Sequence, residues 1–391
     1  RTFRRKKDAE ELSCGFEGQC YKIVKAYCYM KKFRFLLYAV LCLNLVELNA
    51  QQDLSKLSWS KVANSMPEEW YSTEQAVQIA DTVLAYQTEI GGWTKNTGFH
   101  KKINQKEMAK VRKSGIGATF DNGATVTEMR YLAKIYKFHE DAKYKEAFLK
   151  AFNYILEAQY DSGGWPQFYP VRSSKSVSYS GCITFNDNAY VNVMYLLKDI
   201  YENNPCFAAL NLDNKVRQQA RTAFDKGVKC ILDTQIVVDG KKTVWCAQHD
   251  QYTLKPAKAR AYELPSFSGA ESVNIALLLM SIDNPTSDII ASVKGAVEWF
   301  DTHKIADMKY ERYRDEKGER NARLIPAAGV NVWARFYDLE TGKPFFCDRD
   351  GVKRSSIDDL GKERRGGYSW YTSSPEKVLK TYSKWIKKNH L

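Results

Sequence analysis

The chain has 391 residues, of which 44% are hydrophobic, 13% aromatic and 27% charged. This composition excludes a disordered, collagen-like or low-complexity protein, because such chains lack the apolar residues that a packed core requires. Lys and Arg number 59 against 46 Asp and Glu, a formal net charge of +13, which excludes an acidic chain. Without residues 1–50 the numbers are 49 and 41, a net charge of +8, and a basic secreted chain of this kind suits polyanions such as acidic polysaccharide, nucleic acid or anionic lipid. No zinc-finger spacing or RNA-binding motif is present, so nucleic acid is not expected as a partner.

The N-terminal region reads as a secretory signal peptide over residues 30–50. A short basic segment at 30–34 precedes twelve mostly apolar residues at 35–46 and an imperfect small-residue cleavage site at 48–50. Twelve such residues are too few for an ordinary membrane span. Residues 1–29 are interpreted as upstream sequence or a wrong start, and a signal anchor is the alternative. We therefore expect a secreted or periplasmic, monomeric protein with a single mature domain over 51–391 and no stable membrane association.

The next feature is an internal repeat. Gln87 and Gln159 each stand four residues before a Gly-Gly-Trp sequence, and a degenerate third copy runs from Gln235 to Trp245. Each copy follows a segment with apolar residues at helical spacing, and a Gly-Gly pair stops a helix and turns the chain.

A second pattern alternates with the first. Residues 118–136 and 183–201 align with one another, and 268–282 is a weaker third copy. Their apolar positions recur on one helical face, which predicts an inner helix after each loop. Three helix pairs would form an all-α dominated fold, an (α/α)3 toroid-like barrel with its loops at one end. The repeat fades after residue 283, where we expect one more helix, a loop- and strand-rich C-terminal elaboration over 303–371, and a terminal helix.

The predicted loops carry oxygen-rich helix starts. Asp121-Asn122 begins one inner helix and the triplet 186–188 (Asn-Asp-Asn) begins the next. Asp and Asn are favoured helix N-caps, and that explanation alone would account for either motif. Their duplication favours more, because carboxylate and amide oxygens gathered at one end of a toroid form a ligand set for a hard cation, most plausibly Ca²⁺.

Two basic segments are candidates for carboxylate recognition. Lys255, Lys258 and Arg260 crowd one loop, which is interpreted either as a solvated basic loop or as a site where Arg grips a carboxylate bidentately. Residues 344–371 interleave Arg, aromatic and Gly residues around Arg349. That composition suits a groove for an acidic sugar, although its Asp-Arg-Asp-Gly turn also has a purely structural interpretation.

Taken together, these segments resemble the family 10 polysaccharide lyases, the pectate lyases of PelA type. The resemblance runs through ordered blocks over most of residues 55–385, namely 91–96 (GGWTKN), 118–133, 163–170 (GGWPQFYP), 183–189 (ITFNDNA), 245–266, 334–351 and 363–371 (ERRGGYSWY). It implies a calcium-dependent β-elimination of polygalacturonate on an (α/α)3 toroid. The roles it implies are calcium ligation by Asp121, Asp187 and, more weakly, Asn122, catalysis by Arg260, and substrate binding by Arg349 and, more weakly, Lys255.

The implied elimination requires a base, and other functions remain as alternatives. Elimination removes the proton on C5, beside the uronate carboxylate, and expels the C4 oxygen, with Arg260 as the base. Because guanidinium is almost always protonated, this role requires an alkaline medium, and Lys258 or Lys255 is the substitute. The alternatives are a non-catalytic acidic-polysaccharide-binding protein, a glycoside hydrolase using two carboxylates, and a toroid enzyme of the terpene-cyclase type, whose turns also carry Gln-x-x-x-Gly-Gly-Trp. In the third copy, Ala270-Glu271 replaces the Asp-Asn pair of the earlier copies, so Glu271 is doubtful as a calcium ligand.

Overall fold

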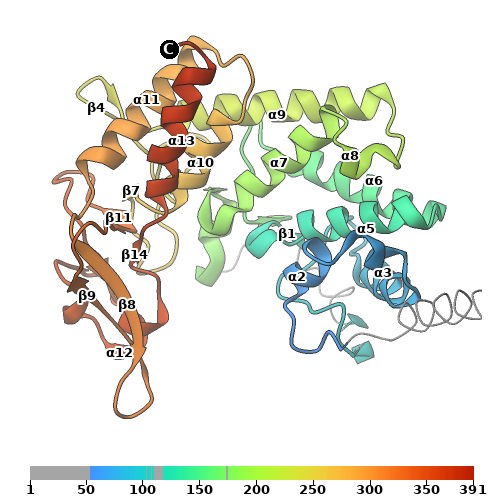
Figure 1. Ribbon diagram of the computed structural model, residues 1–391, viewed down its shortest axis with the longest axis horizontal. Helices are drawn as coiled ribbons and strands as arrows, with labels where there is room; N and C mark the ends of the chain where they lie inside the picture. Colours follow the sequence, from blue (N-terminus) through green and yellow to red (C-terminus); the bar gives the residue numbers. More distant parts are fainter. Residues whose placement is uncertain (1–52, 103, 107, 110–117, 173–174) are drawn as a thin grey trace, which may run out of the picture.

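Four helix pairs follow one another along an open arc in the computed structural model, which describes residues 53–102, 104–106, 108–109, 118–172 and 175–391 (Figure 1). The outer helices are α3 (Glu74–Tyr86), α6 (Ala142–Glu157), α9 (Asn214–Thr234) and α11 (Ser287–Thr302). The inner helices are α5 (Val126–Phe138), α7 (Ala189–Tyr201), α10 (Glu271–Met280) and α13 (Pro375–Lys388). Successive inner helices contact one another. The predicted all-α dominated, toroid-like class is confirmed, with a fourth pair, α11 and α13, added to the three expected.

Shorter helices and turns connect these pairs. They are α2 (Trp59–Asn64), α8 (Pro205–Ala208) and α12 (Lys362–Gly367), with 3₁₀ turns η1 (Glu68–Ser72), η2 (Asp121–Gly123), η3 (Lys175–Gly181), η4 (Asn186–Asn188) and η5 (Ile357–Asp359). The predicted signal peptide at 30–50 and the segment 1–29 lie outside the described residues. Within the described part, no helix is long and apolar enough to cross a membrane.

Helix α6 illustrates how sequence pattern becomes helix. The Asp141 side chain accepts a hydrogen bond from the Lys143 backbone N–H at 3.1 Å, which caps the first turn. Its buried side chains then recur every three or four residues on one face: Tyr144, Ala147, Phe148, Ala151, Phe152 and Ile155. That face packs against the neighbouring helix α5, so the helix is held mainly by burial of one apolar stripe.

The repeated tryptophans fasten each turn to the outer helix that precedes it. Each indole N–H donates to a main-chain carbonyl of that helix at 2.7–2.9 Å, and each ring is almost completely buried. The pairs are Trp93 with Val83, Trp165 with Ile155, Trp245 with Ile231, and Trp333 with Phe300. Trp333 is thus a fourth copy, which the sequence pattern did not reveal because its Gln and Gly-Gly partners are absent.

The repeated glutamines tie each outer helix to the next. The side-chain amides of Gln87, Gln159 and Gln235 donate to Ala147, Ala223 and Ser292 respectively, at 2.9 Å in each case. Each of these carbonyls belongs to the following outer helix. The first Gly of each Gly-Gly pair permits this approach: Gly91 and Gly163 have positive φ, and an added Cβ would meet a carbonyl oxygen of that helix at 2.5 and 2.2 Å. The Gln-Gly-Gly-Trp motif is therefore a structural clamp.

Two-residue antiparallel ladders join successive turns on the inner side. They pair β1 (Ala118–Thr119) with β2 (Phe168–Tyr169), β3 (Ile183–Thr184) with β6 (Gln248–His249), and β7 (Phe267–Ser268) with β11 (Phe336–Tyr337). Each ladder lies directly before the start of an inner helix. The ladders therefore fix the relative positions of the loops that carry the candidate site.

The predicted C-terminal elaboration is confirmed between α11 and α13. Its longest part is the hairpin of β8 (Met308–Arg314) and β9 (Arg320–Pro326), which projects from the arc in Figure 1. The other strand pairs of the elaboration are short: β10 (Trp333–Ala334) with β14 (Tyr371–Thr372), and β12 (Phe346–Cys347) with β13 (Lys353–Arg354). A further two-residue pair, β4 (Val237–Val238) with β5 (Lys241–Lys242), lies between α9 and α10. All five cysteines of the described residues are free thiols.

Candidate active site

Two 3₁₀ turns carry the predicted metal ligands, and they pack against each other. Turn η2 leads into α5 and turn η4 leads into α7. Asn122 and Asp187 occupy the same left-handed conformation, with φ of 53° and 51°, which Asn and Asp tolerate better than most residues. Asp187 therefore corresponds to Asn122 in the repeat, and Asp121 corresponds to Asn186. The two carboxylates come from adjacent rather than identical positions of the repeat.

Asp121 is a buried, ion-paired carboxylate. Only 2% of the residue is exposed, and one carboxylate oxygen pairs with the Lys95 ammonium group. The other oxygen, Oδ1, is buried without a hydrogen-bond partner among the described residues. No side-chain cap bond forms at η2 or at the start of α5. The helix-cap interpretation of Asp121 is therefore wrong, and its burial needs another explanation.

Asp187 is the more exposed carboxylate, with 43% of its side chain accessible. Its nearest cation is Arg335, with 4.0 Å between the guanidinium Nη2 and Oδ1. Burial raises the pKa of Asp187, and Arg335 partly offsets this. The neighbouring carboxylates Asp121 and Glu271 raise that pKa further, which shows that negative charge is concentrated here. Such a cluster favours a bound cation.

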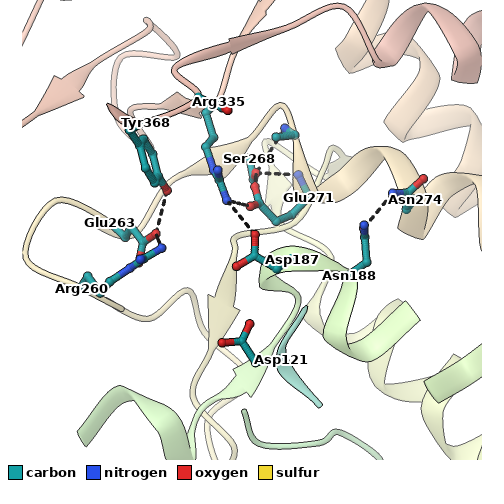
Figure 2. A network of polar contacts seen from close by, with 12 residues as sticks. Asp121, Asp187, Asn188, Arg260, Glu263, Ser268, Glu271, Asn274, Arg335 and Tyr368 are labelled. Carbon is teal, nitrogen blue, oxygen red and sulfur yellow. Dashed lines mark hydrogen bonds and ion pairs between the residues drawn. The ribbon is translucent and has the colours of Figure 1, made fainter. Parts of the chain in front are cut away.

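Arg335 and Glu271 form the buried ion pair beside Asp187 (Figure 2). The Ser268 hydroxyl also donates to Glu271, and the Arg335 guanidinium lies 4.7 Å from the centroid of the Tyr368 ring. Burial lowers the pKa of Arg335, but the surrounding negative charge, chiefly Glu271, outweighs it and raises the pKa overall. Glu271 therefore holds a permanently charged guanidinium in the site. The sequence pattern, in which Glu271 is doubtful as a metal ligand, did not predict this role.

Arg260 makes a bidentate ion pair with a second buried glutamate. Its Nε donates to Glu263 Oε2 at 2.7 Å and its Nη2 donates to Oε1. The Tyr368 hydroxyl donates to the same carboxylate at 2.7 Å. Burial lowers the pKa of Arg260, but the hydrogen bonds and charge of Glu263 outweigh it, so the pKa is raised overall. In Figure 2, Arg335 lies above Asp187, and Arg260 lies to the left of Asp187.

The remaining predicted residues lie at the rim. Arg349 is 66% exposed and pairs with the equally exposed Glu363 at 3.2 Å. Its loop lies against the Arg260 loop, because a Cβ added at Gly351 would be 3.4 Å from the Ala261 carbonyl. Lys255 is exposed in the turn after Asp250, and within the described residues its ammonium group makes no hydrogen bond or ion pair with the cluster.

Four residues of the cluster were not singled out by the sequence: Lys95, Glu263, Arg335 and Tyr368. Lys95 had a signal, since it follows the first Gly-Gly-Trp turn directly. Glu263 also had one, since it stands three residues after Arg260 in a loop of few acidic groups. Arg335 and Tyr368 come from the C-terminal elaboration, and no periodicity places them beside α7.

The donor atoms of the two turns match a hard cation in kind. Asp121 Oδ1 and the Asn186 side-chain amide are buried and unpartnered within the described residues, and Asp187 adds an accessible carboxylate. Oxygen donors of this type suit Ca²⁺, which takes six to eight ligands. The set is incomplete by itself: no group of three or more His, Cys, Asp or Glu in the described part is arranged to hold a metal ion. Ligands from a substrate or from water would have to complete it.

Comparison with known proteins agrees with the family resemblance of the sequence. The family model described as pectic acid lyase matches residues 87–379. The structure is similar to a family 10 polysaccharide lyase from Cellvibrio cellulosa, with TM-score 0.71 and 36% identity, covering 81% of this chain and 94% of the other. A mutant of a family 10 polysaccharide lyase from the same organism, in complex with trigalacturonic acid, gives TM-score 0.71 and 35% identity, covering 83% and 95%. Among curated proteins, no significant match was found.

Proposed function

Because the chain belongs to the pectic acid lyase family, we propose that this polysaccharide lyase cleaves polygalacturonate by calcium-dependent β-elimination after export from the cell. The observation that carries the proposal is the meeting of two arginines, Arg260 and Arg335, with two carboxylates, Asp121 and Asp187, at the ends of the arc's inner helices where these helices begin. An acidic sugar needs cations to hold its carboxylate, and the two aspartates offer oxygen donors, among them the unpartnered Asp121 Oδ1, for a bound cation. The related lyase bound to trigalacturonic acid supports the same substrate class.

The proposed metal ligands are Asp121, Asp187 and Asn122, with the amide of Asn186 available beside them. Bound there, Ca²⁺ would supply Lewis-acid stabilisation of the negative charge that develops on the uronate carboxylate. Lys95 pairs with Asp121. Its exposed fraction of 36% leaves it free to swing toward a substrate carboxylate once Asp121 has another partner.

Arg335 acts as a fixed positive charge in this proposal. The ion pair with Glu271 and the contact with the Tyr368 ring hold the guanidinium in place. No free energy is therefore spent on orienting it when the reaction occurs. A preorganised guanidinium near a developing enolate-like charge stabilises the transition state more than the ground state. Arg335 therefore serves charge stabilisation rather than proton transfer.

Arg260 is the proposed base, and its surroundings determine the pH at which it can lose its proton. The proton to be removed lies on C5 of the sugar, and its acceptor must be an unprotonated guanidinium nitrogen. Glu263 favours the protonated form, whereas a nearby dication would favour the unprotonated form. The reaction therefore requires an alkaline medium, with Lys258 or Lys255 as the alternative base on the same loop.

Arg349 is the proposed rim contact for a neighbouring uronate. Its ion pair with Glu363 is mostly exposed, and exposed ion pairs contribute little to stability. Exchanging Glu363 for a substrate carboxylate therefore costs little free energy. Such a contact would contribute mainly to substrate affinity.

The decisive assay follows ultraviolet absorbance of polygalacturonate solutions with and without a calcium chelator. Elimination creates an unsaturated uronate that absorbs, whereas hydrolysis or simple binding does not. We expect a rise in absorbance that the chelator abolishes and added calcium restores. Binding of polygalacturonate without any absorbance change would establish instead a non-catalytic acidic-polysaccharide-binding protein.

A further inference from the structure

Arg172 is a half-buried cation without an acidic partner. Within the described residues its guanidinium makes no ion pair and no hydrogen bond, and its Nε is buried. Every other buried or half-buried arginine in the described part of the chain donates to a carboxylate or a side-chain amide, as Arg130 does to Asp199 and Arg335 to Glu271. Because moving a charge out of water without pairing it is costly, the unpaired guanidinium calls for an explanation.

The fold places Arg172 beside the turn that carries Asp121. Phe168, four residues before Arg172, pairs with Thr119 in the β1–β2 ladder, and the Asp121 backbone N–H donates to Thr119 Oγ1 at 3.0 Å. The Arg172 guanidinium lies 3.6 Å from the centroid of the Phe168 ring, and the Lys95 ammonium group lies 5.6 Å from the same centroid. Since Lys95 pairs with Asp121, a continuous series of contacts joins Arg172 to a proposed metal ligand.

Tyr179 relates Arg172 to the other half of the candidate active site. This half-buried tyrosine belongs to turn η3. Burial raises the pKa of Tyr179, Arg260 partly offsets this, and Glu263 and Asp121 raise that pKa further. Burial also lowers the pKa of Arg172, and Tyr179 partly offsets this. The Tyr179 phenol therefore lies near both arginines, which places Arg172 at the edge of the candidate active site.

The contact with Phe168 leaves the hydrogen-bonding edge of the guanidinium available. At 3.6 Å the ring covers one face of the planar group, whereas the N–H donors point outward within the plane. Because Nε is enclosed, a ligand would bond to the two Nη groups. Such a pair of donors matches the two oxygens of a carboxylate. The ring also restricts the orientation of the guanidinium before a ligand binds, which reduces the entropy lost on binding.

We propose that Arg172 is a substrate-binding residue that grips the carboxylate of a galacturonate unit next to the one held at the metal site. The inference rests on the proposed polygalacturonate lyase function. Phe168 orients the guanidinium, and Lys95 adds positive charge beside the same ring. Since the grip requires a free carboxylate, a methyl ester on that neighbouring unit weakens binding. Arg172 thereby contributes to the selection of unesterified over esterified substrate.

The kinetic test compares wild type with Arg172→Gln and Arg172→Lys at saturating calcium. We expect Arg172→Gln to raise KM for polygalacturonate about tenfold with little change in kcat, because a hydrogen bond to a charged group is lost. Arg172→Lys keeps the charge but not the planar pair of donors, so its KM should rise by about threefold. Arg221→Gln is the matched control: its guanidinium also lies over a ring, that of Tyr201 at 4.9 Å, but on the outer helix α9, and KM should not change.

Pectins of increasing methyl esterification distinguish a carboxylate grip from a structural role. We expect KM of the wild-type enzyme to rise with esterification more steeply than KM of Arg172→Gln, because the variant has already lost the contact that the ester removes. A variant that raises KM by the same factor on esterified and unesterified substrate would show a structural role and overturn the proposal. An unchanged KM for polygalacturonate in a normally folded Arg172→Gln would also overturn it.

Calorimetry separates this proposal from the proposed lyase function. A galacturonate hexamer is titrated into each protein with calcium at weakly acidic pH, where the proposed base is protonated and turnover is suppressed. We expect Kd to be about tenfold higher for Arg172→Gln than for wild type. That result in a protein that never forms an unsaturated product would refute the lyase function but support the carboxylate grip. Equal affinity in the two proteins, or no binding by wild type, would overturn the grip.

Discussion

Replacing Glu263 with Gln separates the two roles open to Arg260. The change keeps the shape of the side chain and its contact with the Tyr368 hydroxyl, but it removes the negative charge that the guanidinium faces. A base must be unprotonated, and Glu263 favours the protonated form. Removing that charge therefore lowers the pKa of Arg260, and the rising limb of the kcat–pH profile should move to lower pH.

The magnitude follows from the contact itself. A hydrogen bond to a charged group contributes about 1.5–3 kcal/mol. Arg260 is 42% exposed, so solvent screening reduces the difference between the two protonation states to about 1.4 kcal/mol. One pKa unit corresponds to about 1.4 kcal/mol. The limb should therefore shift by about one pH unit, and kcat at a fixed pH on that limb should rise up to about tenfold.

The assay is initial-rate absorbance on polygalacturonate at saturating calcium over a series of alkaline pH values. Tyr368→Phe is the matched control, because it removes a hydrogen bond to Glu263 but leaves its charge, and its profile should not shift to lower pH. Arg260→Lys should lower kcat by about 10²–10⁴-fold with little change in KM. A Glu263→Gln enzyme that folds normally but loses kcat without any shift would show that Arg260 acts as a fixed charge, with the base elsewhere.

Four further outcomes are expected. Asp121→Ala and Asp187→Ala should each nearly abolish activity while the melting temperature stays close to that of wild type; a wild-type rate at low calcium would remove the residue from the proposed metal site. Arg349→Lys should chiefly raise KM, because its contact lies at the rim, and a selective loss of kcat would contradict this. Gln159→Leu should lower the free energy of unfolding by about 2 kcal/mol in denaturant titrations, since two hydrogen bonds of the clamp are lost; an unchanged midpoint would mean that the clamp contributes little. N-terminal sequencing of the exported protein should begin near Gln51, and a product that retains Met30 in the membrane would contradict export by cleavage.

The sequence by itself determined the repeated architecture, because its signals are local. Gln87 and Gln159 stand at fixed spacing from Gly-Gly and Trp, and that spacing is set by one helix end and one tight turn. The oxygen-rich turns at Asp121 and Asp187 were visible for the same reason. Blocks of this kind, repeated in order, also carried the family resemblance, which the comparisons confirmed.

Only the tertiary structure decided which groups face one another in the site. Arg335 binds a glutamate 64 positions away, and Tyr368 reaches Glu263 across 105 positions. No spacing rule links such partners, because the C-terminal elaboration folds back over the loops of the earlier repeats. The fourth tryptophan, Trp333, escaped detection because it keeps the indole bond while lacking the Gln and Gly-Gly that mark the other copies. The burial of Asp121 likewise emerged only from packing, since a helix cap and a buried, ion-paired carboxylate share the same local sequence.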